Sequence, residues 1–144
     1  MGTRSLTKVI TTWEDTNGKK QRKPITCMYR QYDGYMSGHG QELAEWLSEY
    51  TVVNGMGINE TRKIANGMDC LAAQMFAHFK EGAGGIYCMH PDAEDCWEEF
   101  LYEIERIDKQ IFITAYEIWN NKTQEVFHGT PEELLTKIES NVEH

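Results

Sequence analysis

The sequence has no long hydrophobic run and comparatively few basic residues. No apolar stretch approaches the roughly 20 residues that a membrane-spanning helix needs, so we expect no contact with a membrane. The first residues lack the apolar core and cleavage site of a secretory signal, which predicts a cytoplasmic protein. The 14 lysines and arginines are outnumbered by 23 aspartates and glutamates, for a net charge of −9. Proteins that bind nucleic acid need a basic surface, so we expect no direct binding to DNA or RNA.

Complete sets of metal ligands and catalytic residues are also missing. Cys88, His90 and Cys96 supply three potential zinc ligands where a structural site needs four, so we predict no metal and no cofactor. Ser37 and His39 are close in sequence, but this says little about the geometry that nucleophilic catalysis requires. We therefore assign no catalytic residue. The four cysteines are expected to be buried free thiols.

What the sequence contains is the pattern of a single α+β domain covering residues 1–144. The 144 residues are enough to bury one proper core. Apolar alternation predicts strands at 5–14, 25–32, 86–90, 97–107, 111–119 and 125–128, and helical spacing predicts helices at 41–50, 67–80 and 131–141. Residues 97–107 also fit an amphipathic helix, and residues 51–65 are interpreted as a long loop. Short turns favour a mainly antiparallel sheet of five or six strands with three helices on one face, in the order β-β-α-α-β-β-β-β-α.

Two local signals place turns and helix starts. Asn17-Gly18 predicts a two-residue hairpin turn that pairs Ile10 with Ile25 and Leu6 with Tyr29. This register gathers five side chains on one face: Leu6, Ile10, Ile25, Cys27 and Tyr29. The capping-box sequence from Thr130 to Glu133, with proline at the first helical position, predicts the start of the last helix.

Charge is distributed unevenly along the chain. Residues 1–40 carry seven basic and three acidic side chains, a net of +4, while residues 41–144 carry seven and twenty, a net of −13. The basic residues of 19–23 fit a solvated turn, or they form one anion-attracting region with the neighbouring glycine-rich loop. The acidic part fits a role in solubility, or it mimics nucleic acid.

The glycine-rich segment is the candidate ligand site. Its G-x-x-x-G-x-G spacing matches neither a Walker motif nor the Rossmann fingerprint. A strand that passes through glycines into a helix N-terminus nevertheless leaves backbone N–H groups available to an anion. We predict a site built from Arg30, Asp33, Gly34, Tyr35, Ser37, Gly38, His39, Gly40, Asn66 and Gly67. The alternative is a glycine-rich connection packed against the sheet.

Three segments resemble a family of small uncharacterised proteins found in bacteriophages and in archaeal and bacterial genomes. These segments are Tyr29–Gly40, Asn66–Gln74 and Gly84–Tyr87, and the resemblance extends roughly from Thr3 to Ile104. It implies a viral or mobile-element origin, and hence the host cytoplasm as the compartment, and it assigns no role to any residue. The chain departs from the family pattern at Met36, where proline is expected.

Together these features favour a binding protein over an enzyme. The leading hypothesis is that it sequesters an anionic, phosphate-bearing small molecule such as a nucleotide immune signal of the host. One alternative is an acidic mimic of nucleic acid that inhibits a host protein, and another is a nucleotide hydrolase that uses His39 and Asp33. Four tryptophans and seven tyrosines are many for one small core, so we also expect a homo-oligomer, most simply a dimer.

Overall fold

The computed structural model describes residues 2–53 and 63–142, an α+β arrangement of a mixed six-stranded sheet, a two-stranded sheet and helices. Its elements, in order, are β1 (Ser5–Glu14), β2 (Lys20–Arg30), the π-helical turn η1 (Met36–Gly40), α1 (Gln41–Leu47), β3 (Tyr50–Val53), β4 (Lys63–Asn66), α2 (Gly67–Phe79), β5 (Ile86–Met89), β6 (Phe100–Ile107), β7 (Gln110–Trp119), β8 (Lys122–Gly129) and α3 (Pro131–Val142). None of the helices in these residues is long and apolar enough to cross a bilayer.

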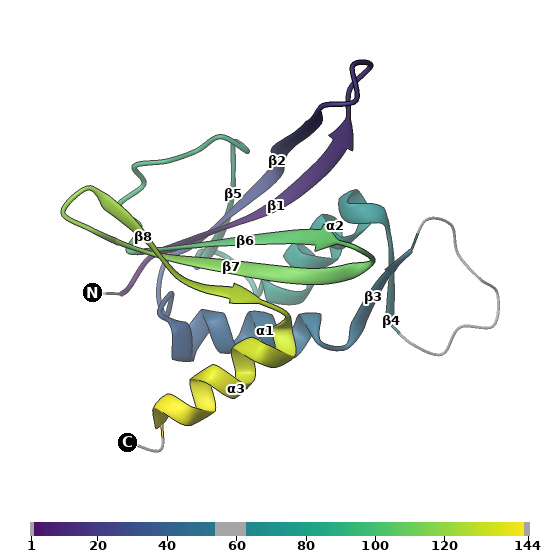
Figure 1. Cartoon of the computed structure of the whole chain (residues 1–144). Coiled ribbons are helices and arrows are strands. Elements are labelled where there is room, and N and C mark those ends of the chain that lie inside the picture. Colours follow the sequence, from purple (N-terminus) through teal and green to yellow (C-terminus); the bar gives the residue numbers. More distant parts are fainter. Residues whose placement is uncertain (1, 54–62, 143–144) are drawn as a thin grey trace.

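The main sheet has six strands in the order β5-β2-β1-β6-β7-β8 (Figure 1). Four of its five pairings are antiparallel, as predicted, but β1 and β6 are parallel, with Thr7 opposite Tyr102 and Val9 opposite Ile104. The sheet is therefore mixed: the prediction of mainly antiparallel pairing matches four pairs and does not match the central one. The segment between β1 and β6 contains α1 and α2, and such a long connection lets the chain return in the same direction.

The predicted loop at 51–65 is wrong at both of its ends. Residues Tyr50–Val53 and Lys63–Asn66 form β3 and β4, which pair in parallel as a separate two-stranded sheet. The glycines and asparagines on which the prediction of a loop depends lie in 54–62, outside the described residues. The observed order therefore contains two strands more than the predicted one.

The first hairpin turns through one residue more than expected. The backbone N–H of Asp15 donates to the carbonyl oxygen of Lys19 at 2.9 Å, which leaves three residues in the loop. Gly18 has φ of +77°, the left-handed conformation that this loop type requires at its last position. Asn17-Gly18 thus marks the turn correctly but not its length.

The predicted pairing of β1 with β2 is correct at the end of the hairpin away from the turn, because a bulge compensates for the longer turn. A bulge lies between Val9 and Ile10, so that Ile10 pairs with Pro24, and the predicted pair of Ile10 with Ile25 is wrong. Proline has no N–H for a continuous ladder and is therefore tolerated at bulges. The longer turn and the bulge shift the register in opposite directions, and Leu6 pairs with Tyr29 as predicted.

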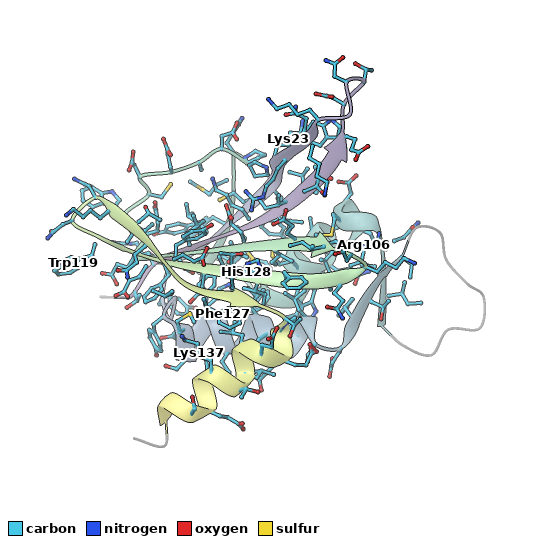
Figure 2. The ribbon with its side chains drawn as sticks, viewed as in Figure 1. Lys23, Arg106, Trp119, Phe127, His128 and Lys137 are labelled. Carbon is cyan, nitrogen blue, oxygen red and sulfur yellow. The ribbon has the colours of Figure 1, made fainter. Side chains whose placement is uncertain are left out.

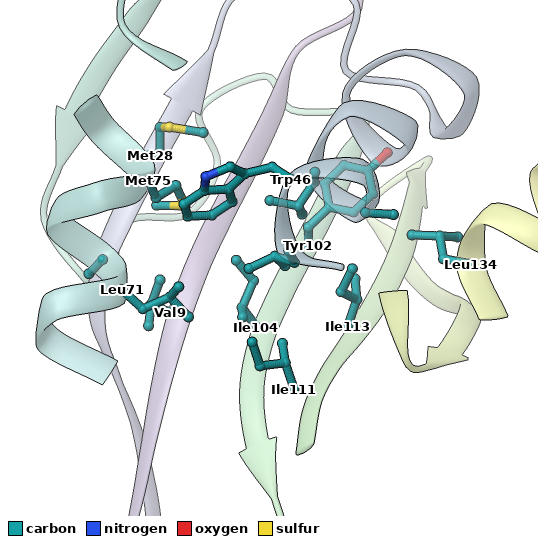
Figure 3. Close-up of a cluster of buried hydrophobic side chains, with 14 of the residues drawn as sticks. Val9, Met28, Trp46, Leu71, Met75, Tyr102, Ile104, Ile111, Ile113 and Leu134 are labelled. Atoms are coloured by element: carbon teal, nitrogen blue, oxygen red, sulfur yellow. The ribbon is translucent and has the colours of Figure 1, made fainter. Parts of the chain in front are cut away.

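The core lies between the sheet and the helices (Figure 3). Val9, Tyr102 and Ile113 come from neighbouring strands and are fully buried, and Leu71 of α2 and Leu134 of α3 pack into the same cluster. The predicted inward orientation of Tyr102 is confirmed, which also settles residues 100–107 as a strand rather than a helix.

The other face of the sheet is partly buried too. Leu6 and Cys27 are buried but lie outside the helix-side cluster. Burial raises the pKa of Cys27 to about 11, so this thiol is unreactive at neutral pH. All four cysteines are free, but only Cys27 is fully buried and Cys88 is exposed, so the prediction of buried thiols holds for one of them.

The capping box at α3 forms as predicted. The backbone N–H of Thr130 donates to Glu133 Oε1 at 2.9 Å, and the N–H of Glu133 donates to Thr130 Oγ1 at 3.2 Å. These bonds satisfy two backbone donors at the helix start and lower the pKa of Glu133.

We expect Thr130→Ala to lower the free energy of unfolding by about 1 kcal/mol, because the cap is lost. Urea denaturation followed by circular dichroism measures this change. Thr136→Ala, an exposed substitution on the same helix, is the control and should change stability by less than about 0.5 kcal/mol. Equal effects of the two substitutions would argue against the cap.

Candidate functional site

The glycine-rich segment forms a closed turn instead of an open loop. The N–H of His39 donates to the carbonyl oxygen of Asp33 at 2.6 Å, and the N–H groups of Gly38 and Gly40 donate to that of Tyr35 at 3.0 and 3.3 Å. Asp33 has φ of +61° and starts the turn. These N–H groups are therefore already occupied by the chain's own carbonyl oxygens.

The glycines of this turn are explained by close packing within the chain. A Cβ atom on Gly38 would lie well under 3.0 Å from the carbonyl oxygen of Asp33, and one on Gly34 would lie 2.7 Å from the Cβ of Ser5. A Cβ on Gly40 would lie 3.2 Å from the hydroxyl oxygen of Tyr102. The geometry favours the second interpretation of the segment, a connection packed against the sheet.

His39 is fully buried at the centre of a polar network. Its Nδ1 lies 3.0 Å from Arg30 Nη1 and its Nε2 lies 2.8 Å from Thr7 Oγ1. A guanidinium can only donate, so Nδ1 accepts and Nε2–H donates to Thr7. Burial, and then the charge of Arg30, lower the pKa of His39 to about 3, so the ring is neutral. The rings of Phe79 and Tyr102 pack edge-on against it, at 5.1 and 5.3 Å.

The hydrolase alternative finds no support in this arrangement. His39 has no exposed surface and both its nitrogens are hydrogen-bonded, so it has no lone pair available for a substrate. Asp33 is exposed, and its carboxylate accepts a 3.4 Å hydrogen bond from Tyr35. Ser37 is also exposed, and none of the described contacts places it beside a base.

Arg30 is paired twice within the chain. Besides His39, its guanidinium forms an ion pair with Glu42 at the start of α1, and only 12% of its side chain is exposed. A ligand phosphate would have to compete with Glu42 for this cation.

Asn66 and Gly67 lie away from the other predicted site residues. They are at the start of α2, whereas Phe79 at its end is the residue that contacts His39. Thirteen residues of helix separate the two ends by about 18 Å. The part of the predicted site between Arg30 and Gly40 is thus brought together, and Asn66-Gly67 is not part of it.

The basic hairpin is remote from this segment as well. Lys20 begins β2 and Arg30 ends it, and a strand of 11 residues spans about 35 Å. Figure 1 shows the hairpin tip projecting beyond the rest of the sheet. Arg22 binds Glu103 and Glu105 at 2.8 and 3.1 Å. The hairpin therefore fits a solvated turn better than a shared anion site.

The hollow beside Arg30 is acidic. It is a cleft of about 580 Å³ between α1, the end of α2 and the start of β5, and we call it the acidic cleft. Its lining is Arg30, Tyr32, Glu42, Glu45, Trp46, Glu49, His78, Phe79, Glu81, Gly84, Gly85 and Ile86. Four carboxylates face one guanidinium, so its net charge is −3 with His78 neutral.

Aromatic rings and a helix end complete the cleft. Trp46 and His78 stack with their centroids 5.3 Å apart and their planes 16° apart. The C-terminal end of α2, the negative end of its dipole, lies here because His78 and Phe79 are its last residues. Lys80 is not in the lining, but its Nζ donates to the carbonyl oxygens of Gly84 and Ile86, two lining residues, at 2.9 and 2.7 Å. The four carboxylates, the aromatic rings and the helix end favour a cation.

Part of the acidic cleft is visible in the sequence. Glu42, Glu45 and Glu49 recur at helical spacing in the segment 41–50. Glu81 and Arg30 come from distant segments, so the complete set becomes visible only in the fold. Among the described residues, no group of three or more histidines, cysteines, aspartates and glutamates is placed to hold a metal ion.

Comparison with known proteins gives no match: no family model, curated protein or solved structure is similar to the chain. The resemblance to small phage and archaeal proteins, and the viral origin that it implies, stay predictions.

Proposed function

We propose that this is a binding protein whose acidic cleft takes a cationic group, a lysine or arginine side chain of a partner protein. The observation that carries the proposal is the charge of the cleft, four glutamates against one arginine that is already paired. Of the functions considered from the sequence, the acidic inhibitor of a host protein that binds DNA or RNA agrees best with this charge.

The aromatic lining supports the same class of ligand. A guanidinium or ammonium group gains from carboxylates on one side and from an aromatic ring face on the other. Tyr32 is half exposed at the edge of the cleft and His78 is exposed beside Trp46, so such surfaces are accessible. An arginine side chain uses both kinds of contact better than a lysine does, because its planar group stacks.

Sequestration of a nucleotide stays a prediction with less support. A phosphate entering the acidic cleft would meet a net charge of −3, and the backbone donors of Gly38 and Gly40 are occupied. Like charges repel, so the glutamates disfavour a phosphate in the cleft, and the occupied N–H groups do not offset this repulsion.

The proposal predicts that Glu45→Gln with Glu49→Gln weakens binding of a hexa-arginine peptide by about three- to tenfold, because exposed ion pairs contribute roughly 0.2–1 kcal/mol each. Isothermal titration calorimetry at low salt measures the affinity. The control replaces two exposed glutamates of α3, with Glu132→Gln and Glu139→Gln. It changes the net charge of the protein by the same amount as the cleft variant and should change the affinity less than twofold. Equal losses in the two double variants would reduce the effect to overall charge.

A further inference from the structure

A second groove lies on the face of the sheet that the helices do not cover. It has a volume of about 710 Å³, and Leu6, Leu101 and Ile118 form an apolar floor contributed by β1, β6 and β7. Trp97 stands at its edge. We propose that this groove, which we call the tryptophan groove, docks a peptide segment of a partner protein that alternates arginine with apolar residues.

Trp97 is held in solvent by a backbone that is unfavourable for it. Its indole is 83% exposed, and φ is +65° at Trp97 and +56° at Asp95. Glu98 fixes this loop: its carboxylate accepts from the N–H groups of Asp95 and Cys96 at 3.2 and 2.7 Å. A bulky residue at positive φ is rare, and such conformations are concentrated where a ligand is held. Large aromatic side chains are also the usual anchors of protein interfaces.

The charge around the groove selects among possible occupants. Glu94, Asp95 and Glu98 face Lys8, so the lining has a net charge of −2. A second copy would bring the same acidic residues face to face, which is unfavourable. The homo-oligomer expected from the sequence therefore has no support at this groove.

Both polar and apolar contacts define the ligand. A guanidinium can stack on the indole of Trp97, as cations do on exposed aromatic rings. In that position it can also bind the carboxylates of Glu94 and Asp95. An arginine alone would leave the leucine and isoleucine floor uncovered, so the neighbouring residue of the segment is apolar. The groove and the acidic cleft have no lining residue in common, so this inference does not depend on the proposed function.

The chain offers a matched control for Trp97. Trp119 is 74% exposed, and Figure 2 shows it at the tip of the β7–β8 hairpin. It does not line the groove, whereas its neighbour Ile118 does. Both tryptophans are exposed, so neither Trp97→Ala nor Trp119→Ala removes a buried contact.

The test uses the peptide acetyl-Leu-Arg-Leu-Arg-Leu-Arg-amide and the full chain carrying Glu45→Gln and Glu49→Gln, which weakens binding at the acidic cleft. We expect Trp97→Ala to weaken binding at least tenfold in a titration followed by fluorescence anisotropy, and Trp119→Ala to leave it within twofold. A peptide with serine in place of leucine should also bind at least tenfold more weakly.

Three results would overturn the inference. They are equal losses in the two tryptophan variants, equal affinity of the serine peptide, and no binding at millimolar peptide. Sedimentation of the free protein provides a further check, because self-association that Trp97→Ala removes would assign the groove to a second copy.

Discussion

Gly38→Val is expected to lower the free energy of unfolding by at least about 3 kcal/mol. The new Cβ would overlap the carbonyl oxygen of Asp33, which also accepts the N–H of His39. The turn can accommodate the valine side chain only if its backbone moves, and this movement would disrupt the hydrogen bonds of Gly38 to Tyr35 and of His39 to Asp33. Urea denaturation followed by circular dichroism measures the loss, and Ser37→Val at the exposed neighbouring position should change stability by less than about 0.5 kcal/mol.

A stable Gly38→Val protein would reopen the question of the glycine-rich segment. If that variant remained folded and lost affinity for a nucleotide, the glycines would act as a ligand cradle, as the sequence predicts. A loss of at least about 3 kcal/mol in the free energy of unfolding is the result that close packing of the turn requires.

Acid should destabilise the protein through His39. Its pKa is about 3 in the folded protein and near 6.5 when unfolded, so the unfolded chain binds the proton first. The stability that this neutral ring contributes is fully present above pH 6.5 and is lost as the pH falls toward 3. Between these values the slope is about 1.4 kcal/mol per pH unit.

The contribution of His39 is separated from that of the carboxylates by comparing variants. Urea denaturation at pH 7, 6, 5 and 4 gives the slope for the unmodified protein and for His39→Gln, in which the amide can accept from Arg30 and donate to Thr7. We expect His39→Gln to have a shallower slope, and His90→Gln, at an exposed histidine, to keep the full slope. Equal slopes for all three proteins would show that His39 titrates normally.

Local sequence signals predicted most elements of the fold. The capping box at Thr130 and the alternation in β6 and β7 depend on neighbours within a few residues, and the structure confirms them. The parallel pairing of β1 with β6 joins residues such as Ser5 and Phe100, 95 positions apart, which no local pattern contains. The bulge near Pro24 is also absent from the local pattern, because it depends on how β1 and β2 pair with each other.

The candidate site also has a part that the sequence predicts and a part that only the fold reveals. Arg30 and His39 are nine residues apart and were placed together correctly by the strand and the turn between them. No local pattern indicates that His39 is buried or that Glu42 binds Arg30, so the sequence alone favours an anion at this site. The acidic cleft also needs α2 to end beside α1, and this packing brings Glu81 and the aromatic rings to the same place.

The measurement that tests the central claim most directly is a pair of proton–nitrogen NMR titrations of the same labelled protein, one with the hexa-arginine peptide and one with ATP. If the acidic cleft takes cations, the peptide will shift the amide signals of Glu45, Glu49 and Gly84, which line it, and ATP will leave them unchanged. Shifts at Gly38 and Gly40 with ATP, and none at the cleft with the peptide, would contradict the account and return the site to the glycine-rich segment.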